Sequence, residues 1–434
     1  MTIRRGESAA AEVTRVSSVA EARSSYRWVV LFAYTLVAFS TQIIWLNFSG
    51  IAEPQVTGIF NASIDQIGYL AAFWPLVFIP LSLPTGLSVD KWGFKLNVII
   101  GSIILTVFSW LRLTAGLNFG LLLLYQTLAG VGQPFIYNAI SKLAGAWFPK
   151  GEQTLANGIG TMGQLVGMIT ALVIAPIMVP DASYSELQEN MLVFSVIVTV
   201  ALVLFVALAK ERKRGTEEQS HSWGSLLGEM KSVVKMRNII VMMLLFFVGV
   251  GIFSGLIQWT ESILSTRGVG SLDAGLIGAA LLVSGIVGMV AVSYVADKYS
   301  RLKQFVTINT LISAVFLFVF GFQAGFVVYA LSAVLVGFFL LSLAPIGLQI
   351  SLETVGEARS GSAASIVWLA SQVGALILIV VMSGLSQVSF TVGSFVSPPW
   401  FVSILLTSVL ALVGFALSFF IVDTRKGTAQ KQSP

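Results

Sequence analysis

The chain has 434 residues, of which 56% are hydrophobic and only 10% are charged, and its formal net charge is +5. Soluble domains carry a charge on roughly a quarter of their residues, so this composition excludes a soluble globular protein and indicates a chain that lies mostly in lipid. There is no cysteine and one histidine, His221, in a polar stretch. Because haem and zinc sites in proteins normally use imidazole or thiolate ligands, we expect no cofactor and no metal.

Residues 1–27 are polar and rich in arginine, which predicts a cytoplasmic tail rather than a signal peptide. Twelve apolar stretches follow, each near the length of about twenty residues that a spanning helix needs. We expect these spans near 28–52, 66–87, 97–115, 119–147, 153–179, 190–209, 238–263, 274–296, 305–323, 326–347, 362–386 and 400–422. The sequence therefore predicts an all-α membrane protein with six-helix bundles over 28–209 and 238–422, a cytoplasmic linker over 210–237 and a second tail over 423–434.

The basic residues predict the orientation. With both termini in the cytoplasm, all of the 25 Lys and Arg residues except Arg112 and Arg267 fall on the cytoplasmic side. Such an excess of positive charge marks the cytoplasmic loops of membrane proteins. We therefore expect a multi-pass protein of the plasma (inner) membrane.

The turn after the second span resembles the signature of the major facilitator superfamily, and it consists of Gly86, Asp90, Lys91, Gly93 and Lys95. A weaker copy with Asp297 and Arg301 follows the eighth span. The repetition predicts two parallel six-helix repeats with a substrate site between them. The charged groups can pair and cap helix ends and so steady the inward-closed state; alternatively, Asp90 and Lys91 only anchor the turn at the lipid headgroups.

Four further segments are similar to the feline leukaemia virus subgroup C receptor-related branch of that superfamily: 45–49, 89–93, 143–148 and 175–180. The branch is associated with choline, ethanolamine and haem transport, and the resemblance implies facilitated movement of a small organic cation. Trp45 matches the tryptophan of the first helix that boxes a quaternary ammonium, and Gln372 matches a glutamine of the eleventh. The family's tyrosine in the seventh helix falls at or beside Ser254, and its glutamine in the fifth falls near Leu165, next to Gln164. The lack of an intramembrane histidine disfavours haem.

An offset of 208 residues relates the two halves. It pairs Gln164 with Gln372, Trp45 with Phe253 and Glu53 with Glu261. We expect the first two pairs to line a central cavity, where the rings offer a cation–π surface worth up to about 2 kcal/mol. The two glutamates are expected at the outer mouth, where they attract cations. Alternatively, the glutamines join helices, the tryptophan packs, and the glutamates mark helix ends. Trp259, Asn138 and Gln133 are further candidates for substrate contact.

No catalytic triad or phosphate-binding loop is visible, so we do not expect an enzyme, and the series Gly158, Gly160, Gly163 and Gly167 is expected to pack helices. Gln126 stands where proton-linked members carry arginine, which favours a uniporter. The sequence thus predicts an alternating-access transporter of a small organic solute such as choline. A proton-coupled exporter of drugs or metabolites, and a receptor or scaffold that retains the fold, remain as alternatives. We expect a monomer whose partners are a small-molecule substrate and lipid, not nucleic acid; the sequence leaves the identity of the solute and the direction of transport open.

Overall fold

The computed structural model describes residues 25–149, 152–212, 228, 230–299, 301–322, 325–356 and 359–422, with the backbone alone at Asp90, Asp297, Ser360, Gly361 and Phe395. These residues contain twelve helical runs that are long and apolar enough to cross a membrane. The predicted all-helical membrane fold is confirmed. The expected tails and most of the expected linker lie outside the described residues.

The N-terminal half supplies the first six runs. Its elements are α2 (Tyr26–Trp45), η1 (Ser49–Ile51), η2 (Ala52–Val56), α3 (Thr57–Phe60), α4 (Ile64–Trp92), α5 (Phe94–Leu111), η3 (Arg112–Thr114), α6 (Phe119–Gly130), α7 (Gly132–Tyr137), α8 (Ile140–Trp147), α9 (Gln153–Met178) and α10 (Tyr184–Leu208). The first run continues to Phe60, past the predicted end near residue 52. It changes direction at Glu53, whose backbone is not helical.

The C-terminal half supplies the other six runs. Its elements are α12 (Arg237–Ser265), α13 (Ser271–Lys298), α14 (Leu302–Gly321), α15 (Phe326–Leu341), α16 (Leu343–Val355), α17 (Ser360–Gly384), β1 (Thr391–Val392), β2 (Phe395–Val396) and α18 (Phe401–Ser418). The tenth run is broken between α15 and α16, as the fourth is broken between α6, α7 and α8. The short β1–β2 hairpin between the last two spans was not expected from the sequence.

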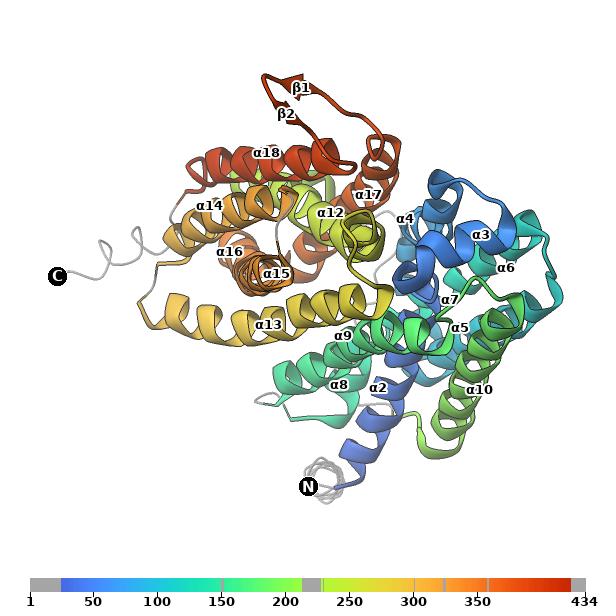
Figure 1. The fold of residues 1–434 in the computed structure, drawn as a ribbon. Helices are drawn as coiled ribbons and strands as arrows, with labels where there is room; N and C mark the ends of the chain where they lie inside the picture. The colour runs from blue at the N-terminus through green and yellow to red at the C-terminus, as the bar shows by residue number, and fades with distance from the viewer. Residues whose placement is uncertain are drawn as a thin grey trace, which may run out of the picture.

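The helix contacts repeat from one half to the other. In the N-terminal half α2 packs on α9 and α5 on α10; in the C-terminal half α12 packs on α17 and α14 on α18. The contacts between the halves are also matched, because α4 meets α17 and α9 meets α13. Figure 1 shows the two bundles side by side, with the N-terminal half in blue to green and the C-terminal half in yellow to red. This pattern is that of two parallel six-helix repeats.

Small residues allow the closest of these contacts. A Cβ atom on Gly163 of α9 would lie 2.5 Å from the carbonyl oxygen of Thr35 on α2, and one on Gly251 of α12 would lie 2.9 Å from that of Gly374 on α17. Glycine is therefore required where the helix backbones touch. The expected packing role does not extend to Gly158, which has open space around it.

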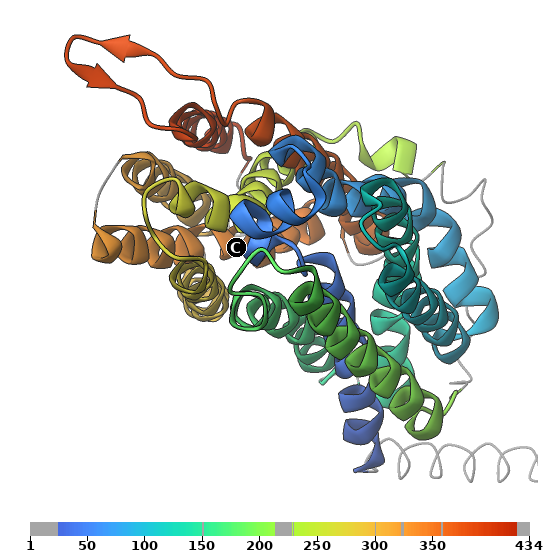
Figure 2. The same cartoon turned by 45° about the vertical axis from the view of Figure 1, so that its right-hand side comes forward.

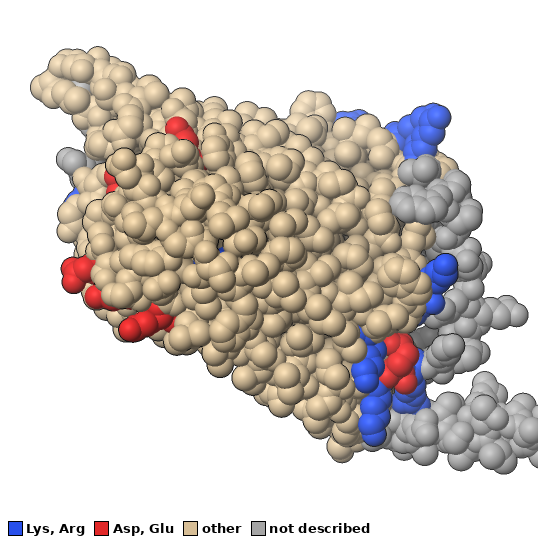
Figure 3. Space-filling model, turned by 90° about the vertical axis from the view of Figure 1, so that its right-hand side faces the viewer, with Lys and Arg blue, Asp and Glu red and all other residues tan. Residues whose placement is uncertain are grey.

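The molecule has two ends that differ in charge. We call the end that carries Gly93, Arg212, Arg301 and Val422 the linker face, and the end that carries Asn61, Ala182, Gly268 and Gly393 the far face. On the side seen in Figure 3, most of the blue Lys and Arg atoms lie at the right-hand end and most of the red Asp and Glu atoms at the left-hand end. The charge asymmetry read from the sequence is thus present along the axis of the helices.

Candidate functional site

The two halves are joined at the far face by hydrogen bonds between the first, seventh and eighth spans. Ser49 Oγ donates to Gln258 Oε1 at 2.5 Å, and the backbone N–H of Glu53 donates to Glu261 Oε2 at 3.1 Å. Gln55 Nε2 donates to Ser271 Oγ at 3.2 Å, and Ser271 Oγ donates in turn to Glu261 Oε1 at 3.1 Å. We call this set of six residues the far-face gate.

Close packing surrounds the far-face gate. The ring of Trp259 lies against Gly68 of α4, where a Cβ atom would be 2.6 Å from it, and Leu172 of α9 lies against Gly275 and Gly278 of α13. From the contact among α4, α9, α12 and α13 the two bundles splay apart, as Figures 1 and 2 show. The described residues thus form a structure that is closed at the far face.

Glu53 and Glu261 were expected at an open outer mouth. The two residues meet across the two halves through the backbone N–H of Glu53 and the carboxylate of Glu261. However, Glu261 is buried in this closed structure, where it accepts hydrogen bonds from Glu53 and Ser271 and does not face water. The half-buried Glu53 contributes its backbone N–H group.

Trp45 and Phe253 belong to one hydrophobic cluster that runs through both halves. Trp45 is buried at the end of α2, with Leu165 and Met168 of α9 in the same cluster, and Phe253 packs against it from α12 while remaining half-buried. The indole N–H of Trp45 donates to the carbonyl oxygen of Ala71 at 3.0 Å, which fixes the ring. Trp45 and Phe253 thus belong to the same hydrophobic cluster, which extends through both halves.

The two glutamines lie on polar faces of their helices. Gln164 follows Asn157 and Thr161 at helical spacing on α9, whereas a separate face of α9 exposes the apolar Leu155 and Val166. A partly exposed polar stripe on a spanning helix is typical of a cavity, and an exposed apolar one of lipid contact. Neither Gln164 nor Gln372 makes a hydrogen bond with another described residue, so both amides are available to a ligand.

Gln372 is likewise partly exposed, on α17. It lies seven residues after Ser365 and four after Trp368, both of which are exposed, and the ring of Trp368 meets that of Phe246 on α12 edge-on at 5.9 Å. The exposed apolar face of α17 runs through Ile377 and Val381 instead. Both glutamines are thus partly exposed on helices that correspond in the two halves, α9 and α17.

The other candidates serve packing between helices. Ser254 is buried beside Gly251 and Gly255, where α12 touches α17. Trp259 is fully buried, donates its indole N–H to the carbonyl oxygen of Ile379 at 2.9 Å and meets Trp400 at 5.1 Å. Asn138 donates to Ser82 O and Thr85 Oγ1, each at 2.8 Å, and so joins α4 to the fourth span.

A polar cluster that the sequence analysis missed lies one helical turn from Trp45, toward the linker face. The hydroxyl group of Tyr137 hydrogen-bonds Thr41, Gln42 and the candidate Gln133. Thr41 and Gln42 precede Trp45 by four and three residues, so these side chains lie on the same side of α2. The sequence signal that could have predicted this cluster is the presence of Thr41, Gln42 and Tyr137, polar residues in the middle of predicted spans.

A second missed feature is the fully buried guanidinium of Arg112, which the sequence analysis assigned to the outside. Arg112 donates to Asn47 Oδ1 at 3.1 Å and to Gln126 Oε1 at 2.9 Å, and it lies over the ring of Phe48 at 5.7 Å. The sequence analysis took Gln126 as the residue that replaces an arginine. In the structure an arginine, Arg112 of the third span, lies beside it. Arg267 also faces protein, because it donates to the last carbonyl groups of α14.

The signature turn is capped by a residue from outside the motif. The carboxylate of Glu211, which follows α10, accepts the backbone N–H groups of Phe94 and Lys95, the latter at 2.7 Å. Burial raises the pKa of Glu211, although these N–H groups and the nearby Lys142 act in the opposite direction. Gly93 has φ of +85°, a backbone conformation that favours glycine, and a Cβ atom there would lie 2.6 Å from this carboxylate.

The rest of the motif is exposed or partly exposed. Lys91 and Arg301 are exposed and Lys95 and Gly86 are half-buried, while the side chains of Asp90 and Asp297 lie outside what the structure describes. The expected pairing of these carboxylates stays a prediction.

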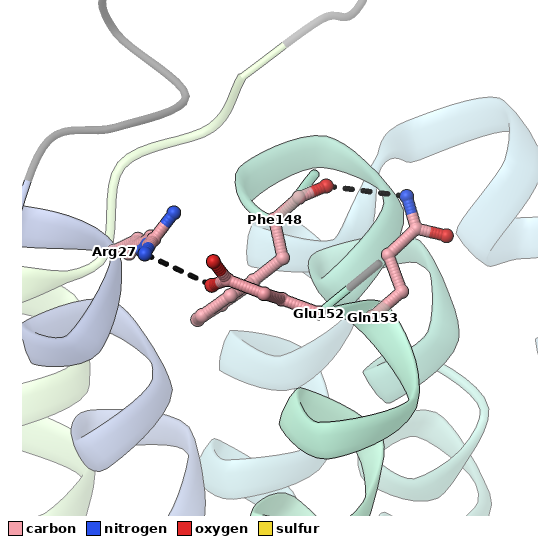
Figure 4. A network of polar contacts seen from close by, with 4 residues as sticks. All are labelled: Arg27, Phe148, Glu152 and Gln153. Carbon is pink, nitrogen blue, oxygen red and sulfur yellow. Dashed lines mark hydrogen bonds and ion pairs between the residues drawn. The ribbon is translucent and has the colours of Figure 1, made fainter. Parts of the chain in front are cut away.

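The linker face also ties the first span to the fourth and fifth. Arg27 Nη2 lies 2.9 Å from Glu152 Oε2, and Gln153 Nε2 donates to the carbonyl oxygen of Phe148 at 3.2 Å (Figure 4). The guanidinium of Arg27 also lies 5.4 Å from the ring of Phe148. These contacts brace the N-terminal bundle at the end opposite to the gate.

Several relatives can be aligned with most of this chain. The chain is 25% identical to "Solute carrier family 49 member A3" of Xenopus tropicalis, over 92% of this chain and 87% of that protein. It is 24% identical to the "Choline/ethanolamine transporter FLVCR2" of Rattus norvegicus, over 95% of this chain and 77% of that protein. The resemblance to this branch of transporters, seen first in short motifs, is confirmed over nearly the whole chain.

Solved structures share the fold. A point mutant of the nucleoside transporter NupG superposes with a TM-score of 0.72 at 13% identity, covering 91% of this chain and all of that one. A bacterial homologue of the human lysosomal transporter Spinster, in an inward-facing and unoccupied conformation, gives 0.71 at 16% identity over 95% of this chain and 99% of that one. Residues 30–379 match the Major Facilitator Superfamily as a family. The chain therefore belongs to the Major Facilitator Superfamily and is a transporter rather than an enzyme.

Proposed function

We propose that this transporter is a facilitator of a small organic cation such as choline or a related amine. The observation that carries the proposal is the hydrophobic cluster shared by the two halves, to which Trp45 and Phe253 contribute from the equivalent helices α2 and α12. An aromatic ring in a desolvated site attracts an ammonium group through the negative face of its π-system. Gln164 and Gln372 supply partly exposed amide groups from the equivalent helices α9 and α17, and relatives with choline and ethanolamine in their names support the same class of solute.

The far-face gate supports movement by alternating access. The hydrogen bonds of Ser49, Glu53 and Gln55 to the other half must all break for the far face to open. Glu261 then loses the N–H group of Glu53 and faces the open cavity as a carboxylate that attracts cations. In this proposal one residue closes the gate in one state and recruits the substrate in the other.

We propose further that the linker face is cytoplasmic, so that the far-face-closed structure is the inward-facing one. The basic residues at the linker face support this orientation. A cysteine in place of the exposed Asn61 should then react with an impermeant thiol reagent applied to intact cells, and one in place of the exposed Ser25 should not. The reverse pattern would contradict the orientation, and the absence of native cysteine leaves no background.

Transport in this proposal needs no proton gradient, an interpretation supported by Gln126 in place of an arginine; the gate contains one hydrogen-bonded carboxylate, that of Glu261, because Glu53 contributes its backbone N–H group. The test is uptake of labelled choline and ethanolamine into proteoliposomes with equal pH on both sides. We expect saturable uptake that stops when the concentrations are equal. Accumulation driven by an imposed pH step would favour the proton-coupled alternative, and uptake of neither amine would contradict the proposed substrate class.

A further inference from the structure

The connection between the last two spans differs from the rest of the far face. It forms the β1–β2 hairpin, in which Thr391 pairs with Val396 and Val392 with Phe395 around a turn at Gly393. Figures 1 and 2 show it projecting from the ends of α17 and α18, away from both helix bundles.

The base of the hairpin is fixed to the last span. The backbone N–H of Trp400 donates to the carbonyl oxygen of Ser386 at 2.7 Å, and the backbone N–H of Ser397 donates to that of Phe390 at 3.0 Å. The ring of Phe390 meets that of Phe401, the first residue of α18, at 5.8 Å. These contacts hold the hairpin beside the end of a membrane-spanning helix.

The hairpin exposes apolar side chains and carries no charge. Val388, Phe390, Val392 and Val396 are exposed by 44%, 38%, 66% and 63%. No Asp, Glu, Lys or Arg occurs anywhere between residues 360 and 422, whereas Asp65, Asp181 and Asp273 lie in or beside other far-face connections. In Figure 3 the projection at the upper left shows neither blue nor red atoms.

We propose that this hairpin lies in the interfacial layer of the membrane on the far face, with Val392 and Val396 inserted among lipid chains. The helix that follows the hairpin, α18, also has an exposed apolar side, with Val409, Leu412 and Val413. A two-stranded hairpin leaves edge N–H and C=O groups unpaired, which excludes the hydrocarbon centre but suits the headgroup layer, where water and headgroups pair with them. An isolated hairpin of this size is marginal in water, so lipid contact also accounts for its order.

The proposal is tested with single cysteines, since the chain has none of its own. Val392→Cys and Val396→Cys are labelled with a small environment-sensitive fluorophore and placed in phosphatidylcholine nanodiscs. Ala182→Cys, at an exposed position in another far-face connection, is the matched control. Lipids with a nitroxide on the acyl chain should quench the labels at 392 and 396 more strongly than the label at 182. Aqueous iodide should show the opposite order.

Equal quenching of all three labels by iodide would overturn the proposal. Energy transfer between labels that grows with the protein-to-lipid ratio would overturn it as well, because a second copy of the chain would then cover the hairpin. As a measurement without a fluorophore, the rate of reaction with an impermeant maleimide in liposomes should be lower at Val392→Cys than at Ala182→Cys; equal rates would contradict the proposal. None of these readouts depends on the transported solute.

Discussion

At the scale of single residues, Trp45 is the most direct test of the substrate site. Trp45→Ala should weaken choline binding by about 1–2 kcal/mol, roughly ten-fold or more in affinity, because the cation–π contact is lost. The loss for the neutral carbon isostere of choline should be smaller, since the ring then offers packing only. Isothermal titration of purified protein measures both. Trp110→Ala, at an exposed position of α5, is the control; equal losses for the two ligands would show that Trp45 only packs.

Replacing Arg112 measures how much a buried guanidinium group contributes to stability. Arg112→Leu should lower the melting temperature, because Asn47 Oδ1 and Gln126 Oε1 lose their charged donor and a buried unsatisfied group costs about 1–3 kcal/mol. Thermal unfolding in detergent measures the effect, with Leu117→Ala at an exposed site of the same connection as control. A melting temperature that rises would mean that the cost of burying the guanidinium exceeds what its hydrogen bonds return.

At the scale of elements, the contact between α2 and α9 depends on the absence of a side chain. Gly163→Leu should destabilise the N-terminal bundle by about 1–3 kcal/mol, because the new side chain meets the backbone of α2 at Thr35. Gly158→Leu is the matched control on the same helix, since nothing lies within 4 Å of its Cβ position. The two variants are compared by melting temperature and by the fraction of monodisperse protein. Similar behaviour of the two would contradict the helix contact.

The sequence predicted the positions of several spanning helices well, but it did not predict the breaks within them. Spans such as α9 and α12 were predicted closely, because hydropathy over about twenty residues reports lipid burial directly. The breaks in the fourth and tenth spans and the continuation of the first to Phe60 were not, since a break leaves the mean hydropathy of the segment almost unchanged. The hairpin lies in the connection between the predicted spans 362–386 and 400–422, for which the sequence analysis predicted no secondary structure.

At the scale of the whole molecule, the far-face gate predicts that holding Gln55 and Ser271 together stops transport. The two side chains share a hydrogen bond of 3.2 Å between the halves. Gln55→Cys combined with Ser271→Cys, bridged by a short cleavable bis-thiol reagent, should abolish uptake in proteoliposomes, and reduction should restore it. Each single variant treated with the same reagent is the control. Transport that continues in the bridged protein would exclude opening at the far face as part of the cycle.

The sequence by itself determined the class of protein, the number of spans and the two-fold repetition. These features follow from composition, periodicity and an offset, which are properties of the chain in order. The tertiary structure alone decided what the polar groups do: Glu261 closes a gate, Arg112 is buried beside Gln126, and Glu211 caps the signature turn. The reason is physical, because the role of a polar group in a membrane depends on which partner from a distant helix meets it, and hydropathy along the chain carries no information about that partner.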